Sequence, residues 1–154
     1  MNSNESELIL LNERIRSGSF ALSDLLEQGQ ILDASGHSLA ACNLYHLWIQ
    51  NSPLSDKHLA LFNYGVLLNR QQRLQEAIQA YALGIELAPQ FGENYINLGL
   101  MWERLGQNEL ALQSWSELVK RFDIEGQVRS QMAVTALNHI GRSEEHTSEL
   151  QSRQ

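Results

Sequence analysis

Two asparagines and two arginines recur in this 154-residue chain at a separation of 34 residues. The asparagines are Asn63 and Asn97, and the arginines are Arg70 and Arg104. An asparagine side chain offers one hydrogen-bond acceptor and two donors, so it can hold the backbone amide of an extended peptide without reading its sequence. The arginines either belong to such a site or are solvated residues that assist the carboxyl ends of helices. The repetition predicts a ladder of positions that hold a peptide.

Apolar residues beside the asparagines extend this candidate site. Val66 and Leu100 each lie three residues after an asparagine of the ladder, where they can supply apolar contact to a ligand. The alternative for the asparagines is a purely local hydrogen bond or exposure to solvent. Glu27 and Gln131 take the place of asparagine at the corresponding positions earlier and later in the chain, so two copies carry the prediction.

No arrangement of residues predicts catalysis. His37 and His46 lie nine residues apart on different helical faces, which is not the spacing of metal ligands. Cys42 is the single cysteine, so an internal disulfide and a thiolate zinc site are excluded and a small buried residue is indicated. No nucleophile elbow, phosphate loop or dinucleotide-binding fingerprint occurs. We expect no catalytic residue, no metal site and no cofactor, and a chain that is not an enzyme by itself.

The elements that must position these side chains follow from the same period. One set of apolar and small landmarks occurs twice, as Leu61, Tyr64, Gly65, Leu68, Ala77 and Tyr81 and then as Tyr95, Leu98, Gly99, Trp102, Ala111 and Trp115. A weaker copy lies 36 residues before the first, and a partial copy begins near Gly126. Apolar residues spaced by three and four predict helices. The small landmarks are expected to let neighbouring helix backbones approach, because a large side chain there would overpack the contact.

These landmarks resemble the tetratricopeptide repeat (TPR), with aromatic, Leu-Gly and aromatic positions in a first helix and alanine, an aromatic residue and proline in a second. Asp123 departs from the pattern, since Pro89 stands at that place one repeat earlier. The resemblance implies an all-α fold, a TPR-like right-handed α-solenoid of antiparallel helix pairs. It also implies that the first helices line a concave groove for a protein or an extended peptide.

The period divides the chain. Residues 1–18 are expected to form a lead-in helix, and residues 22–141 a TPR domain with repeats at about 22–55, 58–91 and 92–125 and a half repeat at 126–141. Residues 142–154 look like the in-frame translation of a sequencing adapter and are expected to be a non-native tail. The last native helix would then lack its partner, so we predict that the chain frays after about Gly126.

Composition narrows the class of partner. The net charge of −7 and the absence of a stripe of Lys and Arg argue against binding to nucleic acid. No apolar run is long enough to cross a membrane, and residues 1–7 lack the features of a signal peptide, so we expect a cytoplasmic protein without a membrane contact. No lysine lies between Lys57 and Lys120. A clamp of basic residues for the acidic tail of a chaperone, known in this family, is therefore not expected.

A narrower resemblance rests on segments 44–48, 62–68, 96–99 and 136–142, which are similar to the amino-terminal repeats of bacterial SPINDLY-type O-linked N-acetylglucosamine transferases. Periodic asparagines line the inner surface of the repeats of such transferases. The resemblance covers about residues 22–141 and includes no part of a transferase domain. It implies a module that recruits protein substrates for a glycosyltransferase. The alternative is a free-standing TPR scaffold or adaptor protein.

Overall fold

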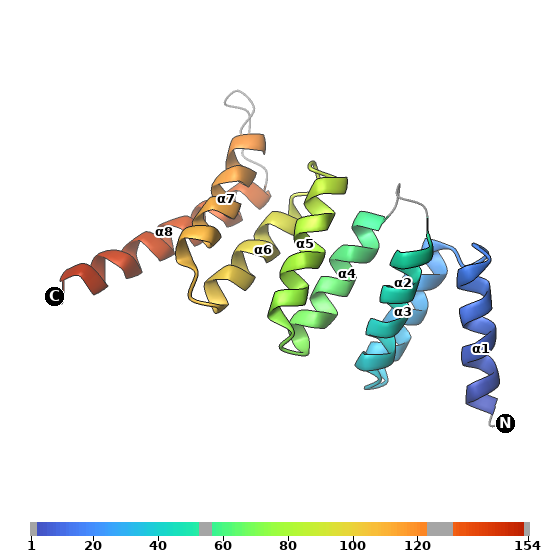
Figure 1. Ribbon diagram of the computed structural model, residues 1–154. Helices are drawn as coiled ribbons and strands as arrows, with labels where there is room; N and C mark the ends of the chain where they lie inside the picture. Colours follow the sequence, from blue (N-terminus) through green and yellow to red (C-terminus); the bar gives the residue numbers. More distant parts are fainter. Residues whose placement is uncertain (1–2, 53–56, 123–130, 153–154) are drawn as a thin grey trace.

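All regular secondary structure in the described part of the chain is helical. The structure is a computed structural model that describes residues 3–52, 57–122 and 131–152. Eight helices lie there (Figure 1). They are α1 (Ser3–Arg16), α2 (Leu22–Ala34), α3 (Ser38–Asn51), α4 (Lys57–Arg70), α5 (Leu74–Leu87), α6 (Glu93–Arg104), α7 (Asn108–Phe122) and α8 (Gln131–Ser152).

The helices form a row of antiparallel hairpins rather than a closed bundle. The pairs α2/α3, α4/α5 and α6/α7 follow one another, and α1 and α8 lie at opposite ends of an elongated molecule (Figure 1). Each first helix also contacts the next first helix, from α2 to α4, α6 and α8, whereas contacts between successive second helices are sparser. We name α2, α4, α6 and α8 the first-helix wall. The predicted all-α helical-repeat solenoid is confirmed.

A glycine in each first helix receives an aromatic ring from the second helix of the same hairpin. The pairs are Gly29 with Tyr45, Gly65 with Tyr81 and Gly99 with Trp115. A Cβ atom on these glycines would lie 2.1 to 2.6 Å from the ring, closer than any real contact. The three rings are almost fully buried. The glycines are therefore needed for space, as expected, but the group that occupies the space is a side chain rather than a neighbouring backbone.

Four helices end in the same short turn. After α1, α2 and α6 the residue with a positive φ is a glycine, namely Gly18, Gly36 and Gly106, with φ of 72°, 80° and 73°. After α4 that place is taken by Gln72, with φ of 62°. Its backbone N–H donates to the carbonyl of Asn69 at 3.0 Å, which closes the helix end. Glycine is the least strained residue in this conformation, so Gln72 is an exception that needs a reason.

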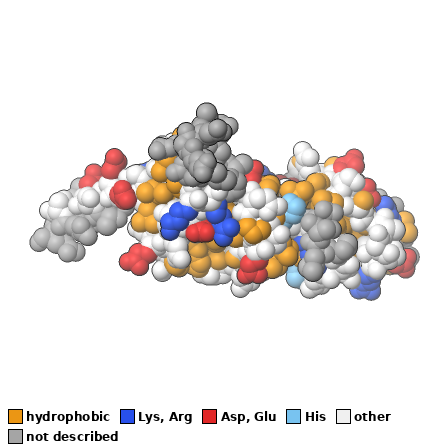
Figure 2. Space-filling model, turned by 90° about the horizontal axis from the view of Figure 1, so that it is seen from above, with side chains coloured by type: hydrophobic (Ala, Val, Ile, Leu, Met, Phe, Trp, Pro, Cys, Tyr) orange, Lys and Arg blue, Asp and Glu red, His pale blue; other side chains and the backbone are white. Residues whose placement is uncertain are grey.

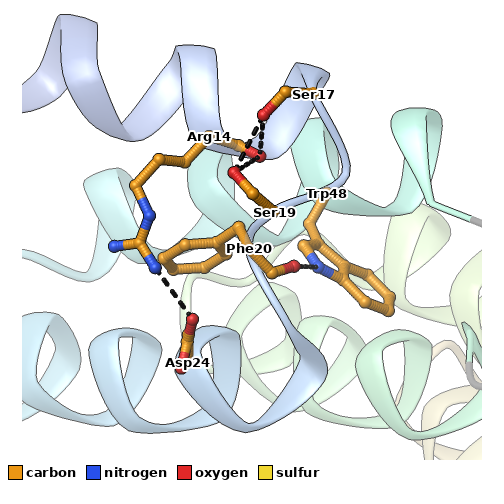
Figure 3. Close-up of polar contacts among 6 residues, drawn as sticks. All are labelled: Arg14, Ser17, Ser19, Phe20, Asp24 and Trp48. Carbon is orange, nitrogen blue, oxygen red and sulfur yellow. Dashed lines mark hydrogen bonds and ion pairs between the residues drawn. The ribbon is translucent and has the colours of Figure 1, made fainter.

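Side chains at the junction of α1 and α2 attach α1 to the first hairpin (Figure 3). The Arg14 guanidinium lies 5.1 Å from the centre of the Phe20 ring and donates to Asp24 at 3.0 Å. The indole N–H of Trp48, on α3, donates to the backbone carbonyl of Phe20 at 2.9 Å. Phe20 and Trp48 are both buried. The lead-in helix thus adds to the core of the first repeat.

The last helix is longer than its sequence indicates. The pattern predicts a helix from about Gly126 to Ile140, whereas α8 runs from Gln131 to Ser152. Residues 126–130 of the predicted helix lie outside the described part. Ser143 is buried, and Arg142 donates to Glu103 of α6 at 3.1 Å. The described residues beyond 141 continue α8, and they do not form a separate second helix of a hairpin with it. That residues 142–154 are a non-native tail stays a prediction.

Candidate functional site

The candidate residues fall into two triplets with the same spacing. Asn63, Val66 and Arg70 lie on α4 at intervals of three and four residues, which places them on one face of the helix. Asn97, Leu100 and Arg104 repeat this order on α6. Since α4 and α6 are neighbours in the first-helix wall, the two triplets lie on successive helices of that wall.

The α4 triplet borders a hollow between α2 and α4. Its volume is about 300 Å³. The residues that line it come from both helices and from α3: Leu26, Gly29, Gln30, Asp33, Tyr45, Asn63, Val66, Leu67 and Arg70. Aliphatic side chains and the Tyr45 ring supply apolar surface, the amides of Gln30 and Asn63 add hydrogen-bonding groups, and a charged pair adds a polar margin. The α6 triplet does not belong to this hollow, and Leu100 packs partly against the core.

The two asparagines differ in their hydrogen bonds. Asn63 is half-buried, and its Nδ2 donates to the backbone carbonyl of Leu59 at 2.9 Å, one helical turn earlier. This bond leaves the Oδ1 of Asn63 as an acceptor. Asn97 is also half-buried, and its side chain makes no hydrogen bond to another described residue. The local bond that we considered as the alternative is thus present at Asn63 alone.

The two arginines contact the preceding first helix. Arg70 pairs with the carboxylate of Asp33 on α2. Arg104 donates to Oδ1 of Asn69 at the end of α4, and to Oε1 of Gln72 at 2.7 Å. Both arginines are exposed, but neither is simply solvated at its helix end.

Asp33 is the most enclosed charge at the hollow. Its side chain is 20% exposed, and its second oxygen accepts from the Ser38 hydroxyl at 2.7 Å. Burial, with a smaller contribution from the negative charge of Asp33, raises the pKa of Tyr45 to about 12. The phenol of Tyr45 therefore stays neutral at physiological pH.

The partners of the arginines were missed by the sequence analysis, although the period contains them. Asp33, Asn69 and Glu103 each stand four residues after the glycine of their first helix. Each accepts from an arginine of the following first helix, and Arg142 of α8 is the donor to Glu103. A search for polar residues at one fixed offset from the glycine would have found all three acceptors.

A second hollow, of about 580 Å³, lies between α6 and α8. Four of its seven lining residues, Arg142, Ser143, Glu145 and Glu149, belong to the segment that we predict to be non-native. We therefore place the candidate site in the α2, α4 and α6 part of the wall.

Other classes of site find little support in the described residues. No group of three or more His, Cys, Asp or Glu is placed to hold a metal ion there. Cys42 is buried, as predicted, and burial raises the pKa of its thiol. No described helix combines the length and the apolar character that a membrane span requires. On the face drawn in Figure 2, the described Lys and Arg side chains form separate small groups rather than a stripe.

Comparison with known proteins finds proteins that are similar to this chain in structure but none that matches it by sequence. No family description and no curated protein matches the sequence. The Sgt2 TPR domain from Aspergillus fumigatus matches with a TM-score of 0.67 and 15% identity, over 84% of this chain and 81% of that one. The TPR2B domain of yeast Sti1, solved in a complex with pHsp70, matches with a TM-score of 0.67 and 17% identity, over 80% and 96%. The first TPR of Spaghetti (RPAP3), bound to an HSP90 peptide, matches with a TM-score of 0.64 and 15% identity, over 80% and 90%.

Proposed function

We propose that this chain, which has the fold of TPR domains, is a module that binds an extended peptide or protein segment along its first-helix wall. The observation that carries the proposal is the hollow between α2 and α4, bordered by Asn63, Val66 and Arg70. The same three positions recur on α6 as Asn97, Leu100 and Arg104. A surface with a repeating order of amide, apolar and cationic groups suits a ligand whose own backbone repeats.

The chemistry of the hollow suits a peptide. An apolar side chain of the ligand can enter between Leu26 and Val66, where it would lose contact with water. The free Oδ1 of Asn63 can accept from a backbone N–H of the ligand, because Nδ2 of the same side chain is held by Leu59. Asn97 can both donate and accept. Hydrogen bonds to the peptide backbone do not depend on the side chains of the peptide. We therefore propose that the specificity of the module is broad and that the hollow selects for an apolar residue.

Two of the similar structures are consistent with this use of the fold. The first TPR of RPAP3 was solved with a bound HSP90 peptide, and the TPR2B domain of Sti1 was solved in a complex with pHsp70. The sequences share 15% and 17% identity with this chain, so they support a peptide-binding role without identifying the ligand.

A peptide array tests the role of the asparagines. We expect the wild-type chain to bind a subset of peptides on an array of random extended sequences, and the double variant Asn63→Ala, Asn97→Ala to bind the same peptides about tenfold more weakly, because two peptide hydrogen bonds are lost. Asn43→Ala is the matched control, since Asn43 is an exposed asparagine on a second helix, α3. Unchanged binding by the double variant would remove the asparagines from the site, and absence of peptide binding by the wild type would overturn the function.

We further propose that the module recruits substrates for a transferase of the SPINDLY type and acts in the cytoplasm. This proposal rests on the sequence resemblance over residues 22–141, and it assigns no catalytic step to the chain itself. A free-standing scaffold is the alternative. Sequencing of the gene beyond the codon for Gly141 distinguishes them: a long frame that encodes a sugar-nucleotide-binding domain supports the transferase, while one more helix and a stop codon supports the scaffold.

A further inference from the structure

Three arginines of the first-helix wall each reach back to the preceding first helix, but their charges are balanced differently. Arg70 pairs with the carboxylate of Asp33, and Arg142 with that of Glu103. Arg104, between them in the row, donates instead to the neutral amides of Asn69 and Gln72. Among the described ion pairs of this wall, Arg104 thus has no carboxylate partner. Within the described part of the chain, two amides hold this cation and no carboxylate neutralises its charge.

The turn after α4 is built to hold this cation. Gln72 has a positive φ of 62°, in a turn type that ends three other helices with glycine. A glycine there would relieve the backbone but would have no side chain. The Oε1 of Gln72 accepts from Nη2 of Arg104 at 2.7 Å, from 32 residues away in sequence. The strained residue Gln72 therefore fixes the orientation of the Arg104 guanidinium. An arginine on the surface without such a contact has no fixed orientation.

The guanidinium keeps donors for a ligand. An arginine has five N–H groups, and the contacts of Arg104 with described residues use two of them, which leaves three for a ligand. The planar fork of an arginine matches a carboxylate, which is the anionic group that an unmodified peptide offers at neutral pH. Arg104 lies one turn beyond Leu100 and two turns beyond Asn97 on the same face of α6. A peptide that contacts those two residues passes the free donors of Arg104.

We propose that Arg104 reads a carboxylate in the bound peptide, the side chain of an aspartate or glutamate, whereas Arg70, which is already paired with Asp33, stabilises the wall. This inference rests on the proposed function, because it needs a peptide along the first helices. It differs from a clamp made of several basic residues, since one oriented arginine selects one acidic position. The ligand is therefore an extended peptide that places an apolar residue in the hollow between α2 and α4. It places an acidic residue beside Arg104, where the ends of α4 and α6 meet.

Selection from a random peptide library displayed on phage tests the inference with three chains. We expect the wild type to enrich peptides with Asp or Glu at one position, and Arg104→Gln to enrich peptides without that preference. Lys120→Gln is the matched control, because it removes the same charge from an exposed site on α7. It should retain the acidic preference. In synthetic copies of the best peptides, Asp→Asn should weaken binding to the wild type about tenfold and leave binding to Arg104→Gln almost unchanged.

A second variant separates charge from orientation. Gln72→Gly keeps the charge of Arg104 and removes one of its two holders, so the effect of Asp→Asn in the peptide should fall to an intermediate value. Circular dichroism at the binding temperature checks that each variant is folded. An acidic preference that persists in Arg104→Gln, or that is lost equally in Lys120→Gln, would overturn the inference. Selected peptides without any acidic preference would overturn it too while leaving the proposed function intact, and a library without any selected peptide would overturn both.

Discussion

At the scale of single residues, burial rather than charge sets the properties of the tyrosines in the core. Tyr45 and Tyr81 are each at most 3% exposed because their rings occupy the space left by Gly29 and Gly65. Burial raises the pKa of both phenols, to about 12 for Tyr45 and further for Tyr81. A phenolate in these positions would lose its hydration without gaining a positive partner.

The raised pKa values predict a loss of stability at alkaline pH. Between about pH 10, where a phenol ionises in the unfolded chain, and about pH 12, the unfolded state releases a proton that folded Tyr45 retains. The free energy of unfolding should therefore fall with rising pH, by about 1.4 kcal/mol per pH unit for each such tyrosine. Urea unfolding at about pH 9 and about pH 11 measures the fall.

Tyr45→Phe is the control for this prediction. It removes one titrating group while keeping the ring against Gly29, so it should show a smaller fall than the wild type over the same interval. An equal fall in both chains would show that Tyr45 does not contribute.

At the scale of helices, the junction between the second and third hairpins depends on a large buried side chain on α6 that packs against a glycine on α5. Asn94 of α6 is fully buried, and neither its Nδ2 nor its Oδ1 has a hydrogen-bond partner in the described structure. It fits because Gly84 of α5 has no side chain, since a Cβ atom there would lie 2.5 Å from Nδ2 of Asn94. The junction thus combines a helical glycine, which is costly, with a buried amide, which is also costly.

A double-mutant cycle measures this coupling. Gly84→Ala should destabilise the wild type by about 1–3 kcal/mol, because the new methyl group overlaps the amide of Asn94. In an Asn94→Ala background the same change should instead stabilise by up to about 1 kcal/mol, the helix-propensity gain of alanine over glycine. Urea unfolding of the four chains gives the coupling energy. Gly141→Ala is the reference for propensity alone, since nothing lies within 4 Å of the added atom.

The hairpins and their turns were predictable from the sequence because one period fixes the glycine, the aromatic residue that fills its space and the polar breaks between helices. The length of α8 was not. Residues 142–154 were set aside as a non-native tail, so no helix was predicted there, but glutamate, glutamine and leucine favour helix even without burial. The contact of Arg104 with Gln72 was also not predictable, because the two residues belong to different repeats and meet through the packing of α6 on α4.

At the scale of the whole molecule, each hairpin is stabilised mainly by its neighbours in the row. The central helices α4, α5 and α6 have neighbours on both sides, whereas the described part of α8 packs mainly on α7 and α6. Its described contacts include the His139 ring, stacked on Trp115 at 4.7 Å, and buried Ala136. Val134 remains 43% exposed. In an array of this kind, stability is the sum of unit and neighbour contributions, so an end unit opens first.

Amide hydrogen exchange tests this order. We expect the amides of α8 to exchange faster than those of α6 and α7, and the amides of α4 and α5 to be the slowest, since opening of the end costs one interface and opening of the centre costs two. Mass spectrometry of peptic fragments after deuterium labelling resolves the segments. Protection after about residue 126 equal to that of residues 92–122 would contradict the prediction.

The contact between Gly84 and Asn94 also limits how such a chain can change its number of units. The glycine and its aromatic partner lie inside one hairpin, so a duplicated hairpin brings its own internal fit. The boundary between hairpins does not copy in this way. Ala60 stands 34 residues before Asn94, so a second hairpin followed by a copy of itself would place Gly84 opposite an alanine and leave an unfilled space. The units of this array are therefore not interchangeable, and gain or loss of one requires a compensating change at the boundary it creates.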